Sequence, residues 1–348
     1  MHLDELARRA TQKLDAPIAE YFNQGARAGF TTAEASLAWE RYRFRPRMLR
    51  DVSRVSTATT ILGHALATPI LIAPTALQRA AHPDGELAMA RATAAAGSLL
   101  EVSTNSGSTF EEIAAEGAPW WLQVYVMRDR GLTAAMLKQA VAAGASAAVL
   151  TVDTPDVGEK WCAGPSAWDV VPDIMSQVNI DAAGLPDSAL DKADDLTPDV
   201  IGWLRDITGL PVVVKGVLRA DDAMTMVSAG AAAVQVSNHG GRQLDFAVST
   251  AEALPEVADA LAGSGTEVYV DGGIRCAEHV LAALALGADA VFIGRPALWA
   301  LAAGGDQGEG GADGVSGLLA GFTAGLRHVM TLAGISTIGE ISGDLVRR

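Results

Sequence analysis

The sequence is poor in cysteine, in aromatic residues and in positive charge. Its two cysteines, Cys162 and Cys276, cannot form a disulfide framework and favour a cytoplasmic protein. Lysine and arginine number 26 against 41 acidic residues, and the net charge of −15 argues against nucleic acid or an anionic membrane surface as the main partner. No run of about 18 apolar residues occurs, so the sequence predicts no membrane span.

Metal-ligand spacing and an N-terminal signal are also missing from the sequence. The six histidines are scattered and neither cysteine belongs to a pair, so no metal site is predicted. The first residues, MHLDELARRATQKLDAP, have the pattern of a polar amphipathic helix and no apolar signal core. What the chain does have is a hydrophobic fraction of 49% over 348 residues, which is enough for one large buried core.

A short unit repeats along the chain: a helix that ends in glycine and alanine, followed at once by an apolar strand. Gly144, Gly230 and Gly287 end three such helices, where glycine supplies the left-handed turn that stops a helix. Apolar runs typical of buried strands cover residues 69–73, 99–103, 121–125, 147–152, 211–215, 233–237, 267–271 and 290–294. Helix-like stretches between them cover residues 84–96, 108–116, 132–143, 198–208, 221–229, 250–261 and 277–286. The second stretch begins with Ser108 and Glu111 at capping-box spacing.

Eight apolar strands that alternate with helices indicate an α/β fold with a parallel sheet closed into a single (β/α)8 TIM barrel. A doubly wound open sheet is the alternative, but its Gly-rich dinucleotide turn after the first strand is missing. We expect one domain over residues 1–348, with an N-terminal helical extension (1–65) across one end of the barrel (66–348). Residues 154–197 form a long insertion after the fourth strand, and such a loop is typically a lid, a partner surface or partly disordered.

Polar residues and glycines follow the predicted strands. In barrels of this kind the active site lies at the C-terminal ends of the strands, so we expect these residues to meet at one mouth. In strand order they are Pro74, Thr75 and Ala76; Ser103; Gln123 and Tyr125; Thr151 and Asp153; Lys215; Ser237, His239 and Arg242; Asp271, Gly272, Gly273 and Arg275; and Gly294 with Arg295.

The last two of these loops predict a phosphate site. Gly272, Gly273 and Gly294 let backbone N–H groups approach an anion, while Arg275 and Arg295 add charge and a planar donor fork. Tight turns alone would account for the glycines but not for the paired arginines. An organic cofactor that carries a phosphate is the economical interpretation.

The loop SNHGGRQLD after the sixth strand predicts acid–base chemistry. An imidazole such as that of His239 is well suited to take a proton near neutral pH. Arg242 can clamp a carboxylate, and Asp153 would raise the pKa of His239 if the two side chains meet across the mouth. Lys215 can simply extend its ammonium to solvent, but inside the mouth it would suit an electron-rich ring such as a reduced flavin.

With these residues in place, the sequence resembles the FMN-dependent α-hydroxy acid oxidase and dehydrogenase family, which includes glycolate oxidase, lactate oxidase and mandelate dehydrogenase. The matching segments run in order from near Tyr21 to the end of the barrel. They are FRPRML (44–49), IAPTALQRAAHPDGE (72–86), LQVYVMRDR (122–130), LTVDTP (150–155), VVVKGV (212–217), VSNHGGRQLD (236–245), DGGIR (271–275) and ALALGADAVFIGRP (283–296). SNHGGRQLD, DGGIR and IGRP together make the resemblance specific.

The resemblance implies FMN as the cofactor and a role for each matched residue. The flavin ring and ribityl chain would contact Pro74, Thr75, Ala76, Ser103, Gln123, Thr151, Lys215 and Ser237, and the ribityl and phosphate end would contact Asp271, Gly272, Gly273, Arg275, Gly294 and Arg295. His239 would be the base, assisted by Asp153, while Tyr125 would hydrogen-bond the substrate and Tyr21 and Arg242 would bind its carboxylate. The α-hydrogen would leave as hydride to flavin N5, with a carbanion route as the alternative.

Two departures from the family pattern surround the substrate. Lys160 occupies the place where the family usually has an arginine for the substrate carboxylate, and lysine lacks the planar fork of arginine. Asn105 stands where a tryptophan or a small residue is common. Both remain candidate substrate-binding residues, and the cofactor prediction is firmer than the substrate prediction.

These departures leave alternatives open. The chain could be an FMN oxidoreductase that acts on a modified biosynthetic intermediate without a simple carboxylate, or a flavin-binding barrel without catalysis. Its partners would be a small-molecule substrate and either oxygen or another electron acceptor. The resemblance also implies a homo-oligomer, often a tetramer.

Overall fold

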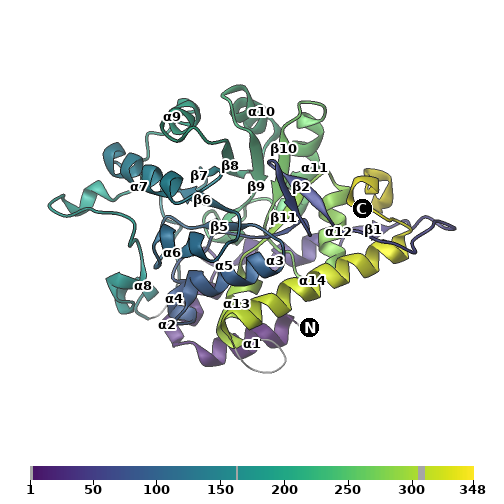
Figure 1. Cartoon of the computed structure of the whole chain (residues 1–348), viewed down its shortest axis with the longest axis horizontal. Helices are drawn as coiled ribbons and strands as arrows, with labels where there is room; N and C mark the ends of the chain where they lie inside the picture. The colour runs from purple at the N-terminus through teal and green to yellow at the C-terminus, as the bar shows by residue number, and fades with distance from the viewer. Residues whose placement is uncertain (1–2, 162–163, 305–309) are drawn as a thin grey trace.

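The computed structural model describes residues 3–161, 164–304 and 310–348 and has a closed eight-stranded parallel barrel at its centre (Figure 1). Its strands, in chain order, are β4 (Ile70–Ile72), β5 (Leu100–Val102), β6 (Trp120–Val124), β7 (Ala148–Thr151), β8 (Val212–Val217), β9 (Ala233–Val236), β10 (Glu267–Val270) and β11 (Ala290–Ile293). Each strand pairs with the next, and β11 pairs with β4 to close the ring. The predicted TIM barrel is confirmed, and every strand lies within the predicted run or extends it by one or two residues.

Helices follow the strands and cover the outside of the barrel. They are α4 (Gln78–Ala81) and α5 (Gly85–Ala95), α6 (Phe110–Ala115), α7 (Arg130–Ala142), α9 (Asp199–Thr208), α10 (Ala220–Ser228), α11 (Thr250–Leu261), α12 (Ala277–Ala285), and finally α13 (Arg295–Ala303) and α14 (Gly311–Ala333). The sequence did not predict α13 and α14, which pack against α1 and α5 respectively. Gly144, Gly230 and Gly287 have φ values of 98°, 101° and 102°, as the predicted turns require.

The strands are apolar throughout because both of their faces are buried. Alternate residues point inward, and the interior contains the rings of Trp121, Tyr269 and Phe292, whose centroids lie 5.6–6.1 Å apart. The other residues, such as Leu100 and Val102, pack outward against the helices. The interior is therefore a packed core, and space for a ligand remains only at the ends of the strands.

The capping box lies one residue later than the sequence predicts. Thr109, not Ser108, caps α6, and its partner is Glu112, not Glu111. The hydroxyl of Ser108 is buried and donates to the carboxylate of Glu86 at 3.1 Å, so it is engaged with the neighbouring helix α5. Tertiary packing selected the cap here.

The N-terminal extension reaches both ends of the barrel, whereas the sequence predicted one end. Its helices are α1 (Leu3–Lys13), α2 (Ala16–Asn23) and α3 (Phe30–Trp39), and α3 approaches the mouth, where Trp39 Nε1 donates to Gly272 O at 2.8 Å. The hairpin of β2 (Thr59–Ile61) and β3 (His64–Leu66) closes the opposite end, with Ile61 and Leu66 packed into the barrel interior. A strand β1 (Arg43–Phe44) between these parts pairs with β12 (Val346–Arg347) near the C-terminus.

The insertion of residues 154–197 lies beside the mouth and contains α8 (Ala167–Val170) and short 3-10 turns at Asp173–Met175 and Asp187–Ala189. Cys162 lies outside the described residues. Elsewhere the insertion is anchored, because the Asn179 side chain accepts from Phe110 N at 3.0 Å and donates to Ser108 O at 2.9 Å. The described part of the insertion is therefore attached to the β5–α6 loop.

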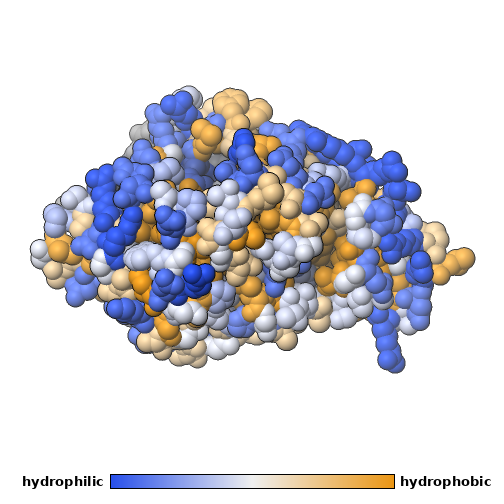
Figure 2. All heavy atoms as spheres, turned by 90° about the horizontal axis from the view of Figure 1, so that it is seen from above, coloured by the Kyte–Doolittle hydropathy of each residue, from blue (hydrophilic) through white to orange (hydrophobic). Residues whose placement is uncertain are grey.

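On the face shown in Figure 2, hydrophilic and hydrophobic residues are interspersed. Across the described ranges of the chain, no helix is both long and apolar enough to cross a membrane. Exposed large apolar side chains include Phe30 and Phe246, whose rings stack 4.8 Å apart.

Candidate active site

One cavity opens at the C-terminal ends of the barrel strands, with about 960 Å³ of space that includes its opening to solvent. Most of the residues that the sequence predicted for the site line it. They are Tyr21, Pro74, Thr75, Ala76, Ser103, Asn105, Gln123, Tyr125, Thr151, Lys215, His239, Arg242, Asp271, Gly272, Gly273, Arg275, Gly294 and Arg295. Asp153, Ser237 and Lys160 are not among the lining residues.

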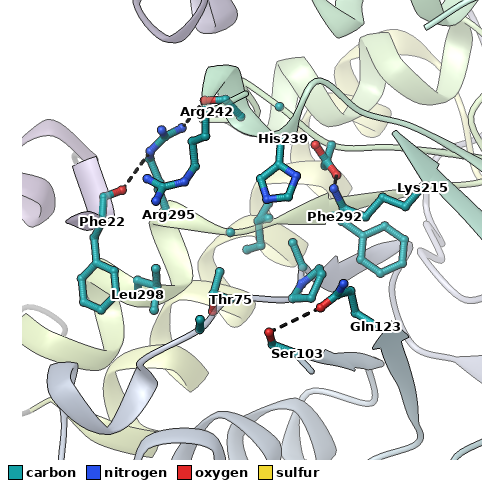
Figure 3. A pocket seen from close by; sticks show the side chains of 18 of the residues that line it. Phe22, Thr75, Ser103, Gln123, Lys215, His239, Arg242, Phe292, Arg295 and Leu298 are labelled. Atoms are coloured by element: carbon teal, nitrogen blue, oxygen red, sulfur yellow. Dashed lines mark hydrogen bonds and ion pairs between the residues drawn. The ribbon is translucent and has the colours of Figure 1, made fainter. Parts of the chain in front are cut away.

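His239 projects into this cavity between the arginines and Lys215 (Figure 3). Its Nδ1 lies 2.8 Å from Asp153 Oδ1, and its Nε2 lies 3.4 Å from the hydroxyl of Tyr125. An Nδ1–H that donates to Asp153 leaves Nε2 as the acceptor on the side of Tyr125. The backbone of His239 has φ 56°, a left-handed conformation that is uncommon outside glycine and that occurs often at functional sites.

Burial sets the protonation of the His239–Asp153 pair. Desolvation lowers the pKa of His239, and the neighbouring Asp153 carboxylate only partly opposes this, so the pKa lies below its ordinary value. Asp153 raises the pKa of His239 as predicted, but the cost of burying an imidazolium exceeds this attraction, so the net shift is downward. Burial also raises the pKa of Asp153, but the charges of His239 and Lys215 outweigh it and bring that pKa to about 2. The pair thus consists of a carboxylate and a neutral imidazole that can accept a proton.

Lys215 lies on the floor of the cavity with 4% of its surface exposed. Its ammonium donates to Ser237 Oγ at 2.8 Å and forms an ion pair with Asp271 Oδ2 at 3.3 Å. Ser237 Oγ in turn donates to Asp271 Oδ1 at 2.8 Å, so Ser237 acts behind the lining. Burial lowers the pKa of Lys215, but the negative charges of Asp271 and Asp153 raise it by more, so the net shift is upward. The ammonium is therefore a fixed positive charge under the cavity.

Gln123, Ser103 and Thr151 form a second polar group on the floor. Gln123 Nε2 donates to Thr151 Oγ1 at 2.9 Å, and Gln123 Oε1 accepts from Ser103 Oγ at 3.4 Å (Figure 3). These bonds fix the amide orientation of Gln123. Beside them, Phe292 and Ala73 give the lining an apolar part.

Three arginine side chains meet at the other end of the cavity. Arg295 donates to the backbone oxygens of Phe22, Gly240 and Gln24 at 2.8–3.1 Å, and the Arg275 guanidinium carbon lies 5.2 Å from the centroid of the Trp299 ring. Burial, with the charges of Arg242 and Arg275, lowers the pKa of Arg295 to about 9, and burial lowers that of Arg275 to about 10. Half-buried cations that repel one another are stabilised by an anion, so this end of the cavity suits a phosphate.

Gly272 and Gly273 adopt φ values of 90° and 77° beside these arginines. A Cβ on Gly273 would lie 2.1 Å from the backbone oxygen of Ala35, so this glycine lets the β10 loop pack against α3. The need for glycine at this position therefore comes at least partly from the extension and not from a phosphate alone.

The residues predicted for the substrate lie on the rim. Arg242 donates to Tyr21 O at 2.6 Å and to Gln24 O at 3.1 Å, and its guanidinium lies 4.7 Å from the centroid of the Tyr21 ring. Lys160 lies outside the cavity lining, and its ammonium donates to Gly158 O at 2.6 Å and to Arg242 O. The structure does not bring Lys160 into the predicted substrate position, because these backbone oxygens hold it behind the Arg242 loop.

Several residues near the site have no signal in the sequence. Phe22 and Leu298 line the cavity from α2 and α13. The insertion adds Gln177, whose Nε2 donates to Asn105 Oδ1 at 2.9 Å, and Trp168, whose ring makes an edge contact with Tyr21. Lys192 Nζ lies 4.0 Å from the centroid of the Tyr125 ring, and burial lowers the pKa of Lys192 to about 8. The long insertion itself was visible in the sequence, but its contacts were not.

Comparison with known proteins decides the family. A model described as FMN-dependent dehydrogenase matches residues 10–348. The chain belongs to the FMN-dependent dehydrogenase family. It is 39% identical to an L-lactate oxidase from Nostoc sp., over 98% of this chain and 96% of that protein. It is 40% identical to a glycolate oxidase from Spinacia oleracea, over 98% of this chain and 94% of that protein.

Solved structures agree with this family assignment. A mandelate oxidase crystallised with (S)-4-hydroxymandelic acid superposes with a TM-score of 0.90 at 39% identity, covering 99% of this chain and 98% of that one. The predicted resemblance is thus confirmed. The chain is an FMN-dependent α-hydroxy acid oxidase or dehydrogenase, and it oxidises 2-hydroxy acids with FMN as its cofactor.

The residues of the cavity fit FMN. The arginine end offers charge for the phosphate, and the floor offers the fixed amide of Gln123 and the fixed charge of Lys215 for a polar ring. The apolar lining of Ala73 and Phe292 suits the faces of an aromatic system.

Proposed function

We propose that this FMN-dependent family member oxidises a 2-hydroxy acid to the 2-oxo acid with His239 as the base. The observation that carries the proposal is the half-buried His239–Asp153 pair at 2.8 Å, in which His239 lines the same cavity as Lys215 and Arg242. A neutral imidazole beside a carboxylate can take the hydroxyl proton at Nε2, and Asp153 then stabilises the imidazolium that forms. Bound FMN supplies the two-electron acceptor for the hydrogen that leaves the α-carbon.

The cofactor is proposed to lie with its phosphate among Arg275, Arg295 and the glycine loops, and with its ring over the floor. Lys215 is fixed by Ser237 and Asp271, so its charge needs no rearrangement when negative charge develops above it. The three groups Pro74, Thr75 and Ala76 follow β4 and line the same floor.

The substrate carboxylate is assigned to Arg242, with Tyr21 beside it and Tyr125 donating to the substrate oxygen. Burial and the nearby Asp153 carboxylate raise the pKa of Tyr125, so its phenol remains a hydrogen-bond donor. Arg242 already donates to backbone oxygens from one of its nitrogens, and the rest of the guanidinium fork is available to orient a carboxylate.

Asn105 is proposed to select the side chain of the substrate. Its Oδ1 accepts from Gln177, so its Nδ2 is the donor that remains for the cavity. This favours a 2-hydroxy acid that carries a hydrogen-bond acceptor on its side chain. We further propose that residues 154–197, which hold Gln177 and Trp168, act as the lid over this part of the cavity.

Oxygen is the proposed electron acceptor, because the relatives reported above are named as oxidases. A homo-oligomer, a single domain over residues 1–348 and a cytoplasmic location remain predictions. The exposed, stacked rings of Phe30 and Phe246 give one area that a second copy could cover.

The position of Lys160 outside the cavity keeps one alternative in view. Arg242 is then the proposed carboxylate anchor. A site that accepts a substrate without a simple carboxylate would differ from this one around a single cation instead of two.

The deciding experiment mixes the FMN-loaded protein anaerobically with a panel of 2-hydroxy acids, including bulky and polar ones, and follows loss of the oxidised flavin absorbance. Admission of oxygen with a peroxide assay then identifies the acceptor. A panel in which no acid bleaches the flavin would reject the substrate class.

A further inference from the structure

Glu101 is a carboxylic side chain inside the barrel that the proposed reaction does not use. It lies on β5 with 0% of its surface exposed. Its neighbours Leu100 and Val102 face the helices, and Leu99 faces the barrel interior, so the alternation of the strand directs Glu101 inward. Its register partner on β6 is Trp121, which also faces the interior. A carboxyl group in such a core is costly if it is ionised and not hydrogen-bonded.

Several buried polar atoms around Glu101 have no hydrogen-bond partner among the described residues. They are both carboxyl oxygens of Glu101, Oε1 of Gln235 and Nε1 of Trp121. Buried polar atoms are hydrogen-bonded in the great majority of cases, so a cluster of such atoms needs an explanation. An ionised Glu101 offers none for Gln235 Oε1, because a carboxylate presents only acceptors.

Gln235 connects this cluster to the floor of the FMN site. Its Nε2 donates to Asp271 Oδ2 at 2.9 Å, and Asp271 also accepts from Ser237 and pairs with Lys215. The amide orientation that serves Asp271 turns Gln235 Oε1 away from it, and that oxygen then requires a donor from the barrel interior. A protonated carboxyl group on Glu101 is such a donor.

We propose that Glu101 is a neutral carboxylic acid in the folded protein, and that its O–H donates to Gln235 Oε1 and so positions the Gln235–Asp271–Lys215 chain beneath FMN. Glu101 is then a positioning residue. The proposal concerns the floor of the cofactor site and does not depend on which hydroxy acid is oxidised.

The charged groups that face Glu101 agree with a neutral form. Burial raises the pKa of Glu101 well above its ordinary range, and Asp271 on β10 adds to this; Lys215 on β8 and the Gln235 side chain on β9 oppose the increase without cancelling it. Lys215 is already paired with Asp271 at 3.3 Å, so its charge is largely compensated. Tyr269 on β10 also faces this region and donates to Glu267, so its hydroxyl is engaged elsewhere. A neutral Glu101 avoids a second negative charge under a ring that accepts electrons.

The direct test is infrared difference spectroscopy of the FMN-loaded protein against its E101Q variant at neutral pH. Glutamine keeps the shape of glutamate and can donate to Gln235 Oε1, so E101Q is the matched control. We expect the difference spectrum to contain the carbonyl stretch of a protonated carboxylic acid. Other carboxyl groups with a raised pKa, such as those of Glu86 and Asp289, are present in both proteins and cancel. Carboxylate stretching bands in place of the carbonyl band would overturn the proposal.

The pH dependence of unfolding gives a second test of the protonation state. The unfolded chain loses the Glu101 proton near the ordinary pKa of 4.5, whereas the folded protein keeps it to a higher pH. The stabilisation is therefore complete below pH 4.5 and is lost as the pH rises toward the folded pKa. Relative to E101Q, the unfolding constant of the wild type should rise by up to about tenfold per pH unit over this range. Parallel pH profiles for the two proteins would contradict a neutral Glu101.

The positioning role is tested by FMN affinity and by the reduction potential of bound FMN. E101L removes the donor and frees Gln235 from its orientation, so it should weaken FMN binding by about tenfold. E101Q keeps a donor and should bind FMN with the wild-type affinity. E101Q should also keep the wild-type potential, since it leaves the charge unchanged. E101L with wild-type affinity would reject the positioning role, and a higher potential in E101Q would show that the wild type carries a negative charge at this position. If E101L does not fold, the E101Q measurements still decide between the two protonation states.

Discussion

The floor and the rim of the cavity are built in different ways. The floor consists of side chains at strand ends. Gln123, Lys215 and Asp271 are 2%, 4% and 6% exposed. Gln123 hydrogen-bonds to Thr151, and Lys215 forms an ion pair with Asp271. The rim consists of Tyr21, Arg242 and Asn105, which come from the extension and two loops and are held by other loops.

This difference teaches where each kind of specificity resides. Atoms on the floor are fixed by the closed sheet, so the position of the proposed cofactor and base is set before any ligand binds. Atoms on the rim depend on segments far away in the chain, including an insertion held by hydrogen bonds to several loops. We therefore expect substitutions on the floor to affect chemistry and cofactor binding strongly and substitutions on the rim to alter mainly the choice of substrate.

The largest effect is expected from His239→Asn, because it removes the proposed base. Asparagine tolerates the left-handed backbone of residue 239, so the loop should keep its conformation. Flavin reduction by a good substrate should slow by about 10²- to 10⁴-fold while FMN stays bound. Anaerobic stopped-flow absorbance measures the rate, and the flavin spectrum gives the FMN content. Reduction at the wild-type rate would show that His239 is not the base of the reaction.

Arg295→Met should weaken FMN binding by roughly 10- to 100-fold, or about 1.5–3 kcal/mol, through loss of charged hydrogen bonds to the phosphate. Titration of the apoprotein with FMN, followed by flavin fluorescence, measures this change. Arg327→Met on the exposed face of α14 is the matched control and should bind FMN like the wild type. Equal affinity in the Arg295 and Arg327 variants would mean that the phosphate binds elsewhere.

Asp153→Asn should lower the reaction rate by roughly tenfold and shift its pH dependence. The base works when neutral, so kcat/KM rises with pH and becomes constant above the pKa of His239, which burial places below its ordinary value. Asp153 raises that pKa, so its neutralisation should move the acidic limb to lower pH. Profiles of kcat/KM against pH for both proteins measure the shift. A limb that moves to higher pH would contradict this account of the pair.

Asn105→Leu should change the choice of substrate more than the chemistry. Acids with a side-chain acceptor should lose about fivefold in kcat/KM relative to acids with an apolar side chain, as expected for one neutral hydrogen bond. Gln177→Leu, which releases Asn105 Oδ1, serves as the companion variant. Competition between a polar and an apolar hydroxy acid gives the ratio directly, and an unchanged ratio would take Asn105 out of substrate selection.

The smallest effect is expected from Lys160→Met, with kcat/KM within about twofold of the wild type, since the ammonium lies behind the lining. Arg242→Met is the contrasting variant and should raise the KM for a carboxylate substrate by at least tenfold. Steady-state kinetics on one hydroxy acid compare the two. A large loss in the Lys160 variant would place this lysine in the substrate site after all.

The sequence predicted the floor and the rim residues Tyr21, Arg242 and Asn105. It misplaced Lys160 and missed the contacts of Gln177 and Trp168. Residues such as Lys215 and Asp271 stand at the C-terminal ends of predicted apolar strands. Parallel strands bring these ends together, so the convergence of the residues at one mouth could be inferred. The placement of Lys160 could not, because motif position says nothing about whether a side chain reaches the cavity or bonds to a nearby backbone oxygen. The cap at Thr109 shows the same limit, since the buried Glu86 engages the competing Ser108.

By itself, the sequence determined the barrel, the cofactor class and the identity of the candidate base. These rest on local periodicity and on residues that adjoin strands, which any closed parallel sheet brings to one end. Only the tertiary structure decided the net direction of the His239 pKa, the contact of the insertion with Asn105 and the burial of Glu101 beside Gln235. Desolvation and side-chain pairing depend on distances between strands and loops that are far apart in the chain, and no local pattern encodes those distances.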